Sequence, residues 1–185
     1  MPKAIFSPSE NTFISQYYPD QNYNRSQNLF VGQFRQSGDI YRSLLRFGSS
    51  NSIAPLNQIP SGSIISKASL QLAIEKNEIP SGTSIRLNVF SISQPWDSRV
   101  VIWNNQPLFQ PVCEGSVTIA PGYATIEVDL TSLVRDWLEG NIYNQGILLT
   151  GDESRNRLVA FHSSFSRNSN LWPRLSVSFN TPTDQ

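Results

Sequence analysis

The chain has 185 residues, a length that suits one all-β domain with a sizeable core. Lys plus Arg and Asp plus Glu both total 14, so the formal net charge is zero and no long-range field would steer the protein to nucleic acid or to an anionic membrane. A lone cysteine, Cys113, excludes an intramolecular disulfide, and no apolar run is long enough to insert into a bilayer.

Alternation of apolar and polar residues dominates the chain and predicts β-strands. In the clearest case, Ala68, Leu70 and Leu72 fall on one side of a strand and Ser69 and Gln71 fall on the other. Turn signals containing Pro, Gly and Asp separate the strands at short spacing. In chain order, the predicted strands cover residues 12–17, 29–34, 41–47, 67–75, 85–89, 124–130, 145–150, 158–163 and 174–179.

One segment, residues 131–139, has helical periodicity. Its apolar residues form one stripe: Leu133, Val134, Trp137 and Leu138. Asp129 or Thr131 can cap its first turn and Gly140 can end it, and we expect this helix to lie over an open end of a sandwich. About nine strands and one short helix predict an all-β, jelly-roll-like β-sandwich. We expect a single domain over residues 1–180, followed by a short polar tail, 181–185.

Catalytic machinery is not evident in the sequence. His162 is the only histidine, no Gly-x-Ser-x-Gly motif occurs, and Cys113 has no local partner, so nucleophilic catalysis lacks its usual base. No Cys/His cluster has zinc spacing and no Gly-rich phosphate loop is present, so we predict a non-enzyme without a cofactor. A structural calcium ion stays an unassigned alternative, because β-sandwich modules often hold one but no dense Asp/Asn loop marks a site.

Short motifs in a fixed order run along nearly the whole chain. They are Pro19-Asp20-Gln21-Asn22-Tyr23, Leu29-Phe30-Val31-Gly32, residues 42–47, residues 59–70, Trp96-Asp97, residues 103–107, residues 128–137, residues 144–149, Phe161-His162-Ser163-Ser164 and Pro173-Arg174-Leu175-Ser176-Val177. Together they resemble the DNRLRE family, the disaggregatase-related repeat, which is grouped with carbohydrate-binding modules. The resemblance implies a β-sandwich with a short helix and implies no reaction. Asn11 and Asn24 depart from the family, which often has Asp and Gly there.

Several aromatic residues fall outside the alternation and are candidate binding residues. They are Tyr17, Tyr18 and Tyr23 around the first turn and Trp172 before Pro173. Sugar rings stack on exposed aromatic faces, which combine apolar area with a polar tip. The alternative is that these rings cover the ends of the sandwich or pack against a neighbouring subunit.

Two arginines, Arg42 and Arg46, alternate on one predicted strand. They could form a basic row for an acidic sugar or a protein partner. The alternative is that they pair with sheet neighbours such as Asp39.

Two functional hypotheses follow, and both place function on surfaces and strand edges. The first, which we favour, is a non-catalytic structural subunit that self-assembles with copies of itself into a surface, coat or fibre. The alternative is a carbohydrate-binding module that recognises a polysaccharide. We favour the first because a binding module usually targets an attached enzyme, and these 185 residues encode none. The resemblance implies an extracellular, cell-surface or spore-surface location, although the N-terminus has no secretory signal pattern.

Overall fold

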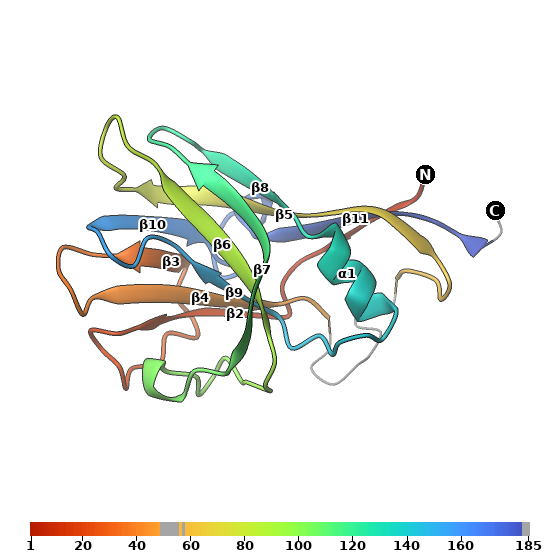
Figure 1. The fold of residues 1–185 in the computed structure, drawn as a ribbon, viewed down its shortest axis with the longest axis horizontal. Coiled ribbons are helices and arrows are strands. Elements are labelled where there is room, and N and C mark those ends of the chain that lie inside the picture. The colour runs from red at the N-terminus through yellow and green to blue at the C-terminus, as the bar shows by residue number, and fades with distance from the viewer. Residues whose placement is uncertain (49–55, 57, 183–185) are drawn as a thin grey trace.

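The chain folds almost entirely into β-structure (Figure 1), as a computed structural model of residues 1–48, 56 and 58–182 shows. The strands in these residues are β1 (Lys3–Phe6), β2 (Glu10–Ser15), β3 (Asn28–Gln33), β4 (Ile40–Arg46), β5 (Ile64–Asn77), β6 (Ile85–Ile92), β7 (Phe109–Ile119), β8 (Thr125–Asp129), β9 (Ile147–Thr150), β10 (Arg157–His162) and β11 (Arg174–Asn180). One helix, α1 (Thr131–Leu138), and two short 3-10 turns, η1 (Trp103–Asn105) and η2 (Ser169–Leu171), complete the described structure. The predicted all-β sandwich with one short helix is confirmed. Part of the predicted tail, 183–185, lies outside the described residues.

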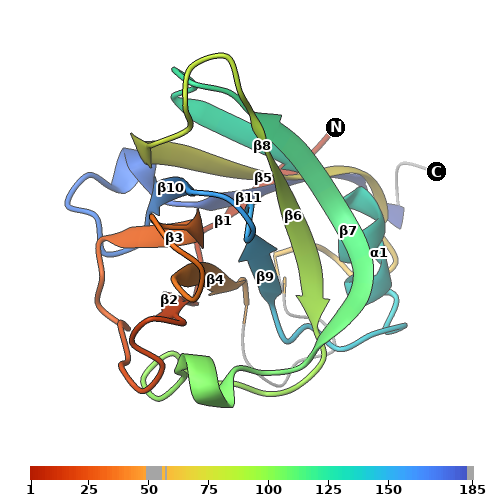
Figure 2. The same cartoon turned by 60° about the vertical axis from the view of Figure 1, so that its left-hand side comes forward.

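A single long strand, β5, connects the two halves of the sheet. Its first part pairs with β11 on one side and β8 on the other, so that Leu70 lies opposite both Leu175 and Val128. Its last part pairs with β10, and Ile74 lies opposite Phe161. The strand order is therefore β1-β11-β5-β10-β3-β4-β9-β6-β7, with β2 added to β4 and β8 added to β5. Figure 2 shows how this sheet curls until its two halves face each other.

The main core fills the space inside the curled sheet. Alternation directs one side of each strand inward, and the largest fully buried side chains there include Leu29, Phe47, Leu70, Leu72, Leu87, Trp137 and Phe161. Full burial of a side chain of this size stabilises the fold by about 1.5–3 kcal/mol. A second, smaller core lies between β2, β4, β6 and β9 and the loop at 93–108, and it contains Ile14, Leu44, Ile92, Trp96, Val101 and Leu148.

Helix α1 lies at one end of the curled sheet (Figure 1), and its apolar stripe faces the main core. Leu133, Val134 and Trp137 are buried, as the periodicity predicts. The carboxylate of Asp129 accepts a hydrogen bond of 2.9 Å from the Thr131 N–H, which satisfies one of the free donors at the start of the helix. Arg135 donates two hydrogen bonds, of 2.7 and 3.0 Å, to the Ile65 carbonyl and fixes the helix on β5.

The prediction of about nine strands missed β1 and β7. Strand β7 contains Pro111, which has no N–H to donate, and Gly115, which lacks a side chain, so its sequence shows no clear alternation. Gly115 lies where β7 passes β8: a Cβ atom there would be 2.6 Å from the Asp129 carbonyl oxygen. The residue is therefore glycine because two backbones approach closely. Strand β1 is only four residues long and pairs with β11 alone.

Candidate functional site

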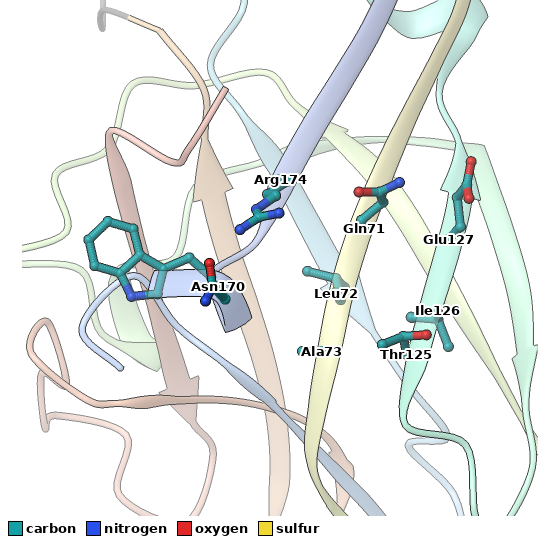
Figure 3. Close-up of a pocket in the computed structure, with 9 residues that line it drawn as sticks. Gln71, Leu72, Ala73, Thr125, Ile126, Glu127, Asn170 and Arg174 are labelled. Carbon is teal, nitrogen blue, oxygen red and sulfur yellow. The ribbon is translucent and has the colours of Figure 1, made fainter. Parts of the chain in front are cut away.

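The outer surface of β11, β5 and β8 carries a hollow of about 470 Å³, which we call the outer trough (Figure 3). Its polar side chains come from four parts of the chain: Gln71 from β5, Thr125 and Glu127 from β8, Arg174 from β11, and Asn170 from η2. Trp172, directly after η2, and the apolar residues Leu72, Ala73 and Ile126 complete the lining.

Strand alternation and register assemble the trough. Leu70, Leu72, Val128 and Leu175 are buried in the core, so their neighbours along the same strands face outward. Gln71 pairs in register with Arg174 on one side and Glu127 on the other, so the three side chains form one row across the strands (Figure 3). In the next row, Ser69 and Ser176 are 4% and 6% exposed. Neighbouring atoms therefore cover these two small side chains, and they add no free polar group to the trough.

Local hydrogen bonds hold Trp172, which precedes Arg174 by two residues and lines the same trough. The indole Nε1–H donates to the Ser166 carbonyl at 2.8 Å, which fixes the direction of the ring. The Asn168 side chain accepts from the Asn170 N–H at 3.1 Å and stabilises η2, which positions Trp172. The indole is half-buried, so part of its surface remains available to a ligand.

The trough contains one acidic and one basic side chain, Glu127 and Arg174, and only Glu127 has an ion-pair partner among the described residues. The Glu127 carboxylate lies 3.2 Å from the Lys67 ammonium. A hydrogen bond from Ser69, followed by the interaction with Lys67, lowers the pKa of Glu127, which keeps it an ionised acceptor. Arg174 has no hydrogen-bond or ion-pair partner for its side chain among the residues that the structure describes, and the same holds for Gln71.

The trough therefore combines an oriented aromatic ring with donors and acceptors that the protein itself leaves free. Thr125 and Asn170 add a hydroxyl and an amide whose side chains also have no partner within the described residues. Each such group can exchange water for a ligand hydroxyl at a net gain of about 0.5–1.5 kcal/mol. A sugar ring, with an apolar C–H face and a rim of hydroxyls, suits this combination.

Comparison with known protein families agrees with this chemistry. The model of carbohydrate-binding module family 96 matches residues 2–178. The chain belongs to this family. No curated protein matches the chain at a significant level. The family supports the carbohydrate-binding class that the DNRLRE resemblance implied, while the DNRLRE name itself stays a prediction. It favours the carbohydrate-binding hypothesis and gives no support to the self-assembling subunit.

The aromatic residues predicted as binding candidates lie in different parts of this family 96 module. Trp172 lies in the outer trough. Tyr17 and Tyr18 are each 51% exposed, and their rings meet edge to face with centroids 4.9 Å apart in a separate hollow near β4. Tyr23 stacks on Phe13 at 4.3 Å, so one face of its ring is covered by the protein. The structure does not bring the three tyrosines and Trp172 into one site.

The arginine candidates have partners within the protein. Arg42 forms a bidentate ion pair with Glu153, with N–O distances of 2.8 and 3.0 Å. Its guanidinium lies 4.9 Å from the centroid of the Trp103 ring. Arg46 is 1% exposed and pairs with Glu10. Neither arginine pairs with Asp39, which the sequence suggested as a partner, and neither lines the outer trough.

Five polar residues of the trough were not predicted as binding residues: Gln71, Thr125, Glu127, Asn170 and Arg174. The alternation did place Gln71, Glu127 and Arg174 on polar faces of their strands. The sequence held no signal that these faces belong to adjacent strands, because register depends on pairing between segments more than 40 residues apart.

Two further properties bear on function. In residues 1–48, 56 and 58–182, no group of three or more His, Cys, Asp or Glu side chains is placed to hold a metal ion. No helix in these ranges is long and apolar enough to cross a membrane.

Proposed function

We propose that this family 96 module binds a polysaccharide in the outer trough and performs no catalysis itself. The observation that carries the proposal is the row of Gln71, Glu127 and Arg174 beside the oriented indole of Trp172. Trp172 would cover the C–H face of one sugar residue. Arg174 and Gln71 would donate to ring or hydroxyl oxygens, and the ionised Glu127 would accept from a hydroxyl.

The open position of the trough favours binding along a glycan chain over capture of a buried small molecule. The row runs across three strands of the outer face, and neighbouring strands are about 4.8 Å apart, so it covers roughly 10 Å. Part of the ligand would stay in water, so each contact contributes modestly and we expect moderate affinity. We expect such a module to act outside the cell or at its surface, where polysaccharides lie.

Binding to a panel of soluble polysaccharides, measured by affinity electrophoresis and titration calorimetry, tests the proposal. For a polysaccharide that the wild type binds, Trp172→Ala and Arg174→Ala should each weaken affinity about tenfold, a loss of about 1.4 kcal/mol. Matched controls are Tyr143→Ala, because Tyr143 is 63% exposed and lies outside the trough, and Arg86→Ala on β6. Both controls should bind like the wild type.

Two results would count against the proposal in different ways. If the wild type binds no polysaccharide in the panel, carbohydrate binding itself is unsupported for this chain. If it binds and the variants Trp172→Ala and Arg174→Ala keep wild-type affinity, the ligand is held elsewhere on the module.

A further inference from the structure

A second hollow, of about 320 Å³, lies beside the hairpin between β3 and β4, and we call it the hairpin hollow. Its lining residues are Tyr17 and Tyr18 from the segment after β2, residues 34–36 and Asp39 from the hairpin, and Tyr41 from β4. This volume is at the small end of ligand pockets, about 300–1,000 Å³. The hollow therefore has room for one or two sugar rings and not for a long segment of a chain.

Tyr17 and Tyr18 form an aromatic corner at its edge. Their ring planes meet at 82°, and half of each side chain is exposed. The Ser15 hydroxyl accepts a hydrogen bond from the Tyr18 N–H at 3.2 Å, which holds the corner against the end of β2. Two perpendicular rings offer one face and one edge to a ligand, and both surfaces suit C–H groups.

The buried wall of the hollow contains a carboxylate, that of Asp39. Asp39 is only 6% exposed, and its Oδ1 atom has no hydrogen-bond partner among the described residues. This atom is fully buried, so a ligand in the hollow does not reach it, and the carboxylate acts on the hollow through its negative charge. Tyr41 lies next to Asp39, and burial together with a hydrogen bond to Asp39 raises the pKa of Tyr41 to about 12. The Tyr41 phenol therefore stays protonated and donates to the Asp39 carboxylate.

The hairpin also places a cationic side chain, Arg35, at the hollow. Arg35 has a φ of 64°, a left-handed conformation that is unfavourable for a residue with a side chain. A 2.7 Å hydrogen bond from its N–H to the Asn156 side chain holds it there. Its guanidinium lies over the Phe34 ring, 4.7 Å from the centroid. Strained residues of this kind are concentrated at ligand sites, where the surrounding structure holds them in place.

We propose that the hairpin hollow is a second carbohydrate site, which takes an uncharged sugar residue. The tyrosine corner contacts the C–H face of the sugar, and the Arg35 guanidinium donates a hydrogen bond to a hydroxyl. The Asp39 carboxylate disfavours an anionic ligand, and Arg35 disfavours a cationic one, so a neutral ring with several hydroxyls fits best. The proposal shares its ligand class with the proposed function but concerns a different surface.

The hairpin hollow and the loop that carries Trp172 meet opposite ends of β3. The hairpin hollow follows Gln33, the last residue of β3. The loop that holds Trp172 contacts the other end, because the Ser163 N–H donates to the Gln27 carbonyl at 2.9 Å just before β3 begins. A six-residue strand is roughly 17–20 Å long. Two sites this far apart can bind two glycan segments at once and raise avidity for a polysaccharide.

Nitrogen-15 NMR titration of the whole chain with short neutral cello-, manno- and xylo-oligosaccharides tests this proposal. We expect the amide resonances of Gln36 and Gly38 in the hairpin to shift with a neutral sugar. These shifts should persist in Trp172→Ala. In Tyr18→Ala the affinity measured at the hairpin should fall at least about tenfold. Tyr18→Phe keeps the ring and should stay within about threefold of the wild type.

The possible outcomes separate the two sites. Shifts confined to the outer trough, or hairpin shifts that Tyr18→Ala leaves unchanged, would overturn the second site and leave the proposed function standing. Shifts at the hairpin without shifts at the outer trough would overturn the proposed function and leave the second site standing. A second variant, Asp39→Asn, keeps the shape of the side chain but removes its charge, so it should bind a uronic acid at the hairpin more strongly than the wild type does. Stronger hairpin binding of a uronic acid or an amino sugar than of neutral sugars would overturn the ligand class.

Discussion

Arg46 gives the sharpest test of how this module is held together, because the sequence suggested a ligand-binding role and the structure places it inside. It is 1% exposed, forms an ion pair with Glu10, and donates a 2.8 Å hydrogen bond to the Trp96 carbonyl. Its guanidinium also lies 4.7 Å from the centroid of the Trp96 ring. These contacts join β2 and β4 to the loop that closes the second core.

The expected effect of Arg46→Ala can be worked from these contacts. Removing one partner of a buried ion pair costs about 3–5 kcal/mol, because the other charge is left uncompensated. Glu10 keeps hydrogen bonds from the Ser98 N–H and hydroxyl, and its side chain is 24% exposed, so we expect the lower limit, about 3 kcal/mol. A double-mutant cycle with Glu10→Gln should give a coupling energy of about 1–2 kcal/mol.

Urea unfolding followed by tryptophan fluorescence measures this loss of stability. Arg99→Ala is the matched control, because Arg99 also pairs with an acid, Asp97, but its side chain is 77% exposed. Its replacement should change the free energy of unfolding by no more than about 0.5 kcal/mol. The reasoning is refuted if Arg46→Ala and Arg99→Ala have the same stability, or if Arg46→Ala stays stable and loses carbohydrate binding.

Two further predictions concern the backbone and the pH dependence of stability. Gly32→Ala should destabilise the fold by at least about 2 kcal/mol in the same urea assay, because its φ is +104° and a Cβ atom would lie 2.2 Å from the Arg157 carbonyl oxygen. Gly38→Ala, with a φ of +87° and no atom within 4 Å of the added Cβ, should cost only about 1 kcal/mol; equal losses would contradict the steric argument. Because the pKa of Tyr41 is raised from 10.0 to about 12, its contribution to stability is present below pH 10 and is lost as the pH rises from 10 to 12. Tyr41→Phe should therefore lose less stability than the wild type over that interval, and an unchanged pH profile would speak against the raised pKa.

The sequence alone determined the class of fold and which side of most strands faces water. Alternation has a period of two residues and is a local property, so it identified the polar sides that carry Gln71, Glu127 and Arg174. The helical stripe with Trp137 was equally local, and the structure has a helix over Thr131–Leu138. Strands without alternation, such as β7 with Pro111, gave no such signal and were missed.

Only the tertiary structure decided which polar residues meet and which are used within the protein. Arg42, Arg46 and Tyr23 look like surface residues in the sequence. The two arginines form ion pairs with separated segments of the chain, and Tyr23 stacks on Phe13 of β2. Conversely, the outer trough brings Gln71 and Trp172 together although about a hundred residues separate them in the chain. The physical reason is that side-chain direction is set by the local backbone, whereas register and burial are set by long-range pairing across the curled sheet.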